Sequence, residues 1–598
     1  MVYFLYLGTR LICNSNREVY MNNIKLLSLF ILSQIVVACG GSAGDDEDKN
    51  IASDLPDINA THQVLAFNDL GMHCADLDYS TFVILPPYNV VHSQVIERGT
   101  MPRILDDSQV NVSYRAVQDA SGSINTTSQN QAGAIHKSNF WNTNPATGNT
   151  YAFDLFGLNP PADKGLSLNP DNGQTMPGIL NPYVANDDQP FNEFDTTKKW
   201  FAANGIPVLP VDDAGQLNAY PLMRVSAALP ATGKTLATLD VVLPVASEAD
   251  CQNCHTLGEV GTADNNPDYI LPDDISDPNS VLQAAKHNIL VLHDAKDNTD
   301  LLNEKPVLCA RCHYSAALDL AGAGPAGEQL NNPKMSEVMH GHHGGLTDPS
   351  TGDPLFPTDG TVEETCYQCH PGKVTKCLRG AMGGAGIECV DCHGSMQAVG
   401  RASRNPWLDE PRCESCHTGD AVSHLGTDIR LRQAWDDDIN VATPRLASNK
   451  RFAENAGTLY RNSLGHGGVA CEGCHGSTHA IWPNAMPGAN DNLAAIQLQG
   501  HAGVITECSA CHTSLPNTLD GPHGMHNVND RGWNLRHEDF YEHNANACRA
   551  CHGQNLEGTV LSETAADRDL LRDDDGDQTI HLSKGTAVSC DLCHEKPE

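Results

Sequence analysis

Residues 366–417 have the sequence CYQCHPGKVTKCLRGAMGGAGIECVDCHGSMQAVGRASRNPWLDEPRCESCH, which contains the motif Cys-x-x-Cys-His three times. The motif occurs six more times after residue 250, and the nine copies account for eighteen of the 22 cysteines. Such a tandem series predicts one repeated chemistry rather than a set of disulfides. The motif residues are Cys251, Cys254 and His255; Cys309, Cys312 and His313; Cys366, Cys369 and His370; Cys389, Cys392 and His393; Cys413, Cys416 and His417; Cys471, Cys474 and His475; Cys508, Cys511 and His512; Cys548, Cys551 and His552; and Cys590, Cys593 and His594.

The spacing suits two thiols that add to the two vinyl groups of one porphyrin, while the adjacent imidazole binds the iron from the same side. Each motif therefore predicts one covalently bound haem c, nine in all. Zinc is the alternative, because a Cys-x-x-Cys pair is half of a tetrahedral zinc site. Zinc sites do not require a histidine after every pair, and nine pairs would leave one unmatched, so the sequence favours haem.

The surplus of histidines predicts the second axial ligands of these irons. Nine of the 27 histidines belong to the motifs, and most of the others also follow residue 250. The close pairs His340/His343 and His523/His526 could each serve two neighbouring haems. We expect distal ligands at His287, His293, His340, His343, His466, His479, His501, His523, His526 and His543. The region also holds His342, His424, His537 and His581, with Met335, Met339 and Met525 as alternative ligands.

Composition and motif spacing predict a loop-rich fold. Apolar residues make up 40% of the 598, and the chain holds 51 glycines and 34 prolines. The motifs that begin at Cys366, Cys389 and Cys413 are too close in sequence to enclose independent cores, so haems three to five should nearly touch. We expect a mostly irregular multihaem cytochrome domain over 246–598, with short helices around a haem array whose porphyrin faces replace part of the side-chain core.

Residues 55–245 contain no such motif and predict a β-rich domain without haem. Strand-like runs occur at 63–67, 81–85, 90–95, 110–115 and 235–244. The fragment 68–74 combines metal-capable side chains, but a structural loop is the favoured interpretation. Cys74 and Cys377 are the cysteines of the mature body outside the motifs, and they form either one disulfide or two separate thiols.

The first 54 residues predict export and lipid attachment. After Met21, an alternative start, Lys25 precedes an apolar stretch at 26–37. Val36-Val37-Ala38-Cys39 resembles a bacterial lipobox, so we expect a signal peptide over 1–38 and a lipidated cysteine with a flexible tether over 39–54. An ordinary signal peptide or a membrane anchor is the alternative. The lipid at Cys39 would make the chain an outer-membrane lipoprotein, at the cell surface or the periplasmic face.

The formal net charge of −37 argues against nucleic acid as a partner, because phosphate binding needs a basic face. An acidic surface suits cationic or metal-bearing partners, or serves solubility alone. The run of aspartates at 573–577 lacks the spacing and the closing glutamate of an EF-hand loop, so we expect a solvated turn there.

Four segments resemble multihaem outer-membrane cytochromes of metal-respiring and marine proteobacteria. They are residues 305–313, 466–479, 499–512 and 521–526, within a likeness that covers roughly 251–594. The resemblance implies electron transfer between the periplasm or outer membrane and an external or periplasmic acceptor, with redox proteins or extracellular acceptors as partners.

Two other functions remain open. A multihaem reductase with one open haem would act on a nitrogen or sulfur oxyanion, but the Cys-x-x-Cys-Lys motif of pentahaem nitrite reductases does not occur in this sequence. A filament-forming structural cytochrome would take a distal histidine from a neighbouring copy, so a homo-oligomer is compatible with the sequence. We favour an electron carrier without catalytic side chains.

Overall fold

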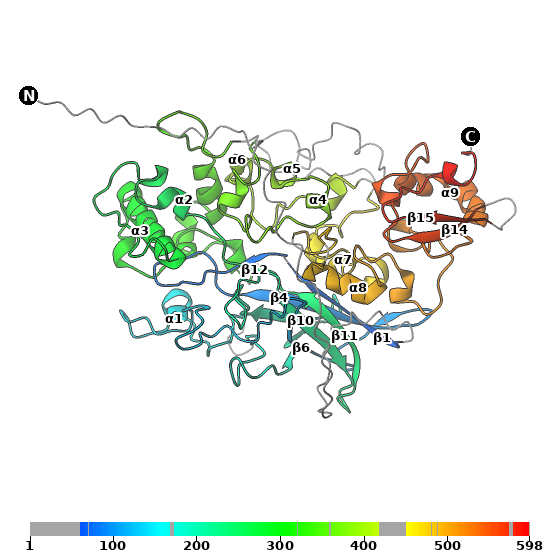
Figure 1. Cartoon of the computed structure of the whole chain (residues 1–598), viewed down its shortest axis with the longest axis horizontal. Coiled ribbons are helices and arrows are strands. Elements are labelled where there is room, and N and C mark those ends of the chain that lie inside the picture. Colours follow the sequence, from blue (N-terminus) through cyan, green and yellow to red (C-terminus); the bar gives the residue numbers. More distant parts are fainter. Residues whose placement is uncertain are drawn as a thin grey trace, which may run out of the picture. The chain divides into compact units, whose positions relative to one another are not determined.

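The computed structural model describes residues 60–69, 71–167, 173–319, 321–357, 360–417, 446, 450–479, 481–486, 488–572 and 578–596 (Figure 1). The predicted signal peptide, Cys39 and its tether lie outside these residues, as do His424 and the acidic run at 573–577. The described residues belong to one unit. The domain boundary that the sequence suggests near residue 245 therefore stays a prediction.

Two antiparallel sheets form most of the part before residue 247. The first has the order β1-β4-β9-β8, with β5 also paired to β4, and the second has the order β11-β10-β6-β7. Strand β1 pairs with β4 from His62 opposite Glu97 to Asn68 opposite Val91. The strands are β1 (His62–Asn68), β4 (Asn89–Glu97), β5 (Arg103–Ile104), β6 (Asn111–Val117), β7 (Gln189–Pro190), β8 (Glu193–Asp195), β9 (Trp200–Ile206), β10 (Leu222–Ala228) and β11 (Thr235–Val242).

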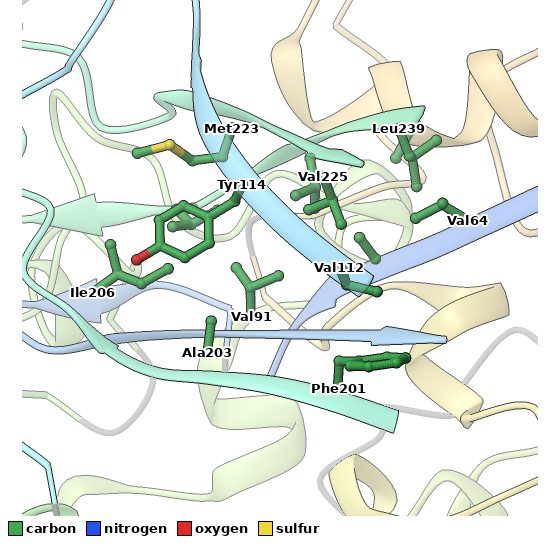
Figure 2. Close-up of a cluster of buried hydrophobic side chains, with 14 of the residues drawn as sticks. Val64, Val91, Val112, Tyr114, Phe201, Ala203, Ile206, Met223, Val225 and Leu239 are labelled. Carbon is green, nitrogen blue, oxygen red and sulfur yellow. The ribbon is translucent and has the colours of Figure 1, made fainter. Parts of the chain in front are cut away.

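The main core lies between these two sheets (Figure 2). Strand β6 alternates, with Val112, Tyr114 and Ala116 buried and the residues between them more exposed, as expected for a strand with one face in a core. Strand β4 is buried along nearly its whole length because the haem-motif region covers its other face. There the Gln94 side chain bonds the carbonyl of Gly468 (3.1 Å) and the amide of Ala470 (2.9 Å).

Short parallel pairs join the sheets to the motif-bearing region. Strand β2 (His73–Cys74) pairs with β12 (Val245–Ala246), and β3 (Phe82–Val83) pairs with β13 (Val307–Leu308). Since β13 ends immediately before Cys309, the second motif is anchored directly on the β-rich part. Near the C-terminal end, β14 (Arg568–Arg572) and β15 (Gln578–Leu582) form a hairpin.

Helix α3 (Pro278–Asp297) is the longest in the described residues, and the next longest, α9 (His537–His552), is interrupted by a non-helical residue at Asn544. Helix α3 begins after Asp277, whose side chain accepts from the amide of Asn279, and ends at Asn298 in the left-handed conformation. Its Lys286 reaches the carboxylate of Asp76 (2.9 Å), which ties the helix to the loop after β2. The other helices are α1 (Tyr151–Phe156), α2 (Gln252–His255), α4 (Ala381–Gly384), α5 (Cys389–His393), α6 (Met396–Val399), α7 (Cys471–His475) and α8 (Leu493–Gln499).

The expectation of a loop-rich fold with short helices and small sheets is confirmed. Strands occur in all five predicted runs, although β3 covers only two residues. Sequence reasoning did not predict β9 and β10, which lie at the centres of their sheets. Among the residues that the structure describes, no helix combines the length and the apolar character needed to cross a bilayer.

Candidate haem-binding cavity

Each of the nine motifs lies on a helical turn. In six of them the histidine amide donates to the carbonyl of the first cysteine, at 2.8–3.2 Å, and the others lie in α5, α7 and the end of α9. Residues separated by three and four positions share one face of such a turn. The fold therefore presents the two sulfur atoms and the imidazole of each motif on one side, as attachment to a single porphyrin requires.

Within the described residues, seven motif histidines face a second histidine from outside the motifs. The ring centroids of these pairs are 5.6–6.5 Å apart. The pairs are His255 with His343, His313 with His293, His370 with His340, His393 with His479, His475 with His523, His512 with His466, and His594 with His537.

This spacing leaves room for one metal ion between two imidazoles, and edge-to-face ring contacts elsewhere in the chain, such as Phe67 with Trp200 at 5.8 Å, share it. A metal bound at about 2.0 Å by the near nitrogen of each ring would set the centroids about 6 Å apart. Direct contact between two rings would allow stacking at about 4.5 Å, as His526 and Trp533 do at 4.3 Å. The residues present therefore fit bis-histidine ligation of an iron at these seven positions.

The second nitrogen of many of these rings is held by the backbone. Nδ1 donates to a carbonyl in His313 (to Pro333, 2.9 Å), His340 (to Ser336, 3.0 Å) and His343 (to Met339, 2.7 Å). His512, His523, His552 and His594 make the same kind of bond. Because a carbonyl only accepts, the proton is on Nδ1 and Nε2 keeps its lone pair, the arrangement found in metal-ligating histidines.

Burial keeps four of these rings neutral. Burial lowers the pKa of His255, His340 and His475 to about 4, with neighbouring histidines adding to the effect. The pKa of His393 falls to about 3 for the same reason. The neutral imidazole is the form that binds metals, so the rings are ready to act as ligands at neutral pH.

One continuous cavity of about 3640 Å³ connects the third to seventh motifs. A site for one small ligand usually has roughly 300–1,000 Å³, so this space suits several large cofactors. The Cys and His residues of all five motifs line it, together with His340, His343, His466, His479 and His523. Met335, Met339 and Met525, the alternative ligands, also lie in its wall.

Neighbouring motifs lie close together, but not simply in sequence order. His340 and His343 face the third and first motifs, and His523 faces the sixth. His526, three residues further on, lies close enough to His552 of the eighth motif for the two side chains to interact electrostatically. The thiols of Cys366 and Cys389 interact directly, which brings together the third and fourth attachment sites.

Besides His526, which stacks on Trp533 with the ring centroids 4.3 Å apart, three of the expected distal ligands face other groups. Nε2 of His287 bonds the carbonyl of Asp268 (3.1 Å). His501 has Nδ1 at 3.1 Å from the Ala502 carbonyl and Nε2 at 3.0 Å from Glu507. His543 is exposed on α9, and its Nδ1 bonds the carbonyl one turn earlier. None of the three comes within ring contact of a motif histidine in the described part of the chain.

His537 is a candidate ligand that we did not select from the sequence. Its ring stacks against that of His594 with centroids 5.6 Å apart and planes at 21°. It lies at the start of α9, six residues before His543, and sequence proximity alone does not separate the two. For the fifth motif, His417 contacts the ring of Phe452 (6.4 Å), while His424 lies outside the described residues.

The remaining predictions concern the other cysteines and other metals. Cys74 and Cys377 are both free thiols in the structure and both line the cavity. Burial, with the nearby Cys377, raises the pKa of Cys74 to about 12. Nowhere in the described part of the chain do three or more His, Cys, Asp or Glu side chains come together as a site for a bare metal ion.

Comparison with family models, with curated proteins and with solved structures gave no match.

Proposed function

We propose that this chain binds nine haem c groups covalently and carries electrons among them. The observation that supports the proposal best is the set of seven motif histidines that each face a non-motif histidine at 5.6–6.5 Å. Haem supplies an iron that changes between the ferric and ferrous states. No acid, base or nucleophile is needed for this activity.

The roles of the protein residues follow from their positions. The paired cysteines would attach the porphyrin, and the adjacent and facing histidines would each offer a nitrogen to its iron. Backbone carbonyls fix the orientation and tautomer of the rings. The mostly apolar cavity walls would lower the local dielectric around the porphyrins, which is one way in which a protein sets redox potentials. An exported chain held by a lipid at Cys39 would place this array at the outer membrane, where redox proteins or extracellular acceptors are its partners.

The number of haems and their spin state test this proposal. The exported protein should give nine haems per chain in the pyridine haemochrome assay, and the oxidised protein should be low-spin by electron paramagnetic resonance. Six haems or fewer would contradict it. A high-spin iron that shifts with nitrite or hydroxylamine would instead support the reductase alternative.

A pair of neighbouring histidines provides a matched test of ligation. His340→Ala should convert one haem to a high-spin form, because His340 faces His370 at 5.8 Å. His342→Ala is the control, since His342 contacts His343 and Lys296 instead of a motif histidine. Equal spectra for the two variants would argue against His340 as an axial ligand.

A further inference from the structure

A second pocket of about 400 Å³ adjoins the large cavity. Asp69, Glu193, Asn204 and Asn462 line both spaces, and we call these four residues the polar passage. Hydrogen bonds hold its walls, from Asn204 to Glu193 (2.8 Å) and from Lys198 to Asn462 (2.7 Å). These four residues thus border both the pocket beside β8 and β9 and the large cavity, whose walls are mostly apolar.

Asp69 lies where the passage meets the cavity. Its Oδ1 is buried without a hydrogen-bond partner, and so are Nε2 of His73, Nε of Arg461 and Oε2 of Glu472, all in the cavity wall. Buried polar atoms are normally satisfied, so four unpartnered polar atoms in one cavity wall make that wall suited to ordered water. The charged and titratable groups that interact with Asp69 are Tyr88, Lys198, Glu410, Arg461 and Glu472. Burial lowers the pKa of His73 and of His92, and Arg461 lowers both further. Glu193 and Asp195 also line the second pocket.

The loop that carries Asp69 is held rigidly against the haem-binding region. Gly71 has a φ of +77°, and a Cβ atom there would lie 2.4 Å from the carbonyl oxygen of His479. The Ser477 hydroxyl donates to the carbonyl of Asn68. Asp69 is therefore fixed beside the fourth haem site, whose proximal His393 faces His479.

We propose that Asp69 is a proton-loading site, which takes up one proton from water in the polar passage when the haem array receives an electron. The inference rests on the proposed function, because it needs the array to be reduced. The electron comes from the external reductant, the proton from water, and the carboxylate of Asp69 becomes a carboxylic acid. Reoxidation releases both, so charge inside the cavity stays balanced.

The electrostatics support this role and give its sign. Burial raises the pKa of Asp69 to about 6, although Arg461 and Lys198 oppose the rise. An electron added nearby is a like charge and raises that pKa further. Between the lower pKa of the oxidised protein and the higher pKa of the reduced protein, the reduction potential therefore falls as pH rises. The limit is about 59 mV for each tenfold change in proton concentration in a one-electron step.

The experiment compares the full-length loaded protein with Asp69→Asn. A spectroelectrochemical titration from pH 5.5 to 8.5 should show a potential that falls with pH above about 6 in the unchanged protein and a weaker dependence in the variant. Each protein is also reduced without dithionite in unbuffered solution while a pH electrode records proton uptake. The variant should take up as much as one proton fewer per chain than the unchanged protein. Asp69→Glu should restore part of the uptake.

Asp188→Asn is the matched control, because Asp188 is an exposed carboxylate that contacts only Arg115, at 3.9 Å, among its ion-pair partners in the described residues. Equal proton uptake by the unchanged protein and Asp69→Asn would overturn the proposal, as would loss of uptake in Asp188→Asn as well. The pyridine haemochrome content is measured on every sample. Nine haems with unchanged uptake contradict the proton-loading site alone, whereas missing haems contradict the proposed function.

Discussion

The β-rich part and the motif-bearing part of this chain bury their interiors in different ways. Between the two sheets, Val64, Val112, Met223 and Leu239 are each at most 4% exposed and pack into one large cluster. After residue 250, the buried apolar clusters are small, as around Ile481 and Trp482, and a cavity of about 3640 Å³ takes the place of a core. The first part buries its interior with its own side chains and with Ala494 and Leu498 of α8, whereas the second has a large cavity where side chains would otherwise pack.

The largest expected effect comes from removing the haems. A chain produced without haem attachment should keep the sheets but lose ordered structure around the third to seventh motifs, because the walls of an empty cavity lose their packing contacts. Limited proteolysis followed by mass spectrometry should place the early cuts after residue 250. A haem-free chain that resists protease evenly along its length would contradict this difference between the two parts.

How far the sequence predicts this structure also differs between the two parts. The motifs mark the proposed haem attachment sites without any knowledge of tertiary structure. Strand β9, Trp200–Ile206, was missed because it is buried on both faces, so it shows no alternation, and it contains Asn204 and Gly205, which are rare in strands. Strand β10 ends in Ser-Ala-Ala, which has little strand propensity.

The sequence does not predict which histidines face the motif histidines. The sequence indicates that a surplus exists, but partner choice depends on contacts between distant segments, as between His466 and His512. His501 follows the pattern of a ligand in sequence, yet Glu507 accepts from its Nε2. Only the folded backbone decides between such outcomes.

The side-chain core of the sheets is tested by Met223→Ala. Met223 is fully buried near the start of β10, so the truncation should lower the free energy of unfolding by about 2–5 kcal/mol. Denaturant unfolding followed by far-ultraviolet circular dichroism measures this loss. The haem spectrum of the folded variant should stay the same, since Met223 lies between the sheets; a changed Soret band would show that the two parts are not separable in this way.

Electrostatic stabilisation of the motif-bearing part is tested at Glu507. Hydrogen bonds from His501 and Arg568 outweigh the effect of burial and lower the pKa of Glu507 to about 2. A carboxyl with a lowered pKa in the folded state stabilises the fold above its unfolded value of about 4.5, and the effect is lost as pH falls toward 2.

Glu507→Gln should therefore cost at most about 3 kcal/mol at pH 7 and little at pH 2.5, because 1 pKa unit corresponds to about 1.4 kcal/mol. Urea unfolding of both proteins at the two pH values measures the difference. Glu363→Gln, on a mostly exposed side chain, is the control. An equal loss at both pH values would mean that shape, not charge, accounts for the contribution of Glu507.

The smallest effect is expected for His287→Ala on α3. Nε2 of His287 bonds the carbonyl of Asp268 at 3.1 Å, so the change removes one partly exposed hydrogen bond and should cost about 0.5–1.5 kcal/mol. Haem content and spin state should be unchanged, in contrast to His293→Ala on the same helix, where the ring faces His313 at 6.4 Å. Electron paramagnetic resonance of the two variants separates a histidine that holds the fold from one that faces a motif histidine. A high-spin signal in His287→Ala would mean that α3 turns to present a different face once haem is bound.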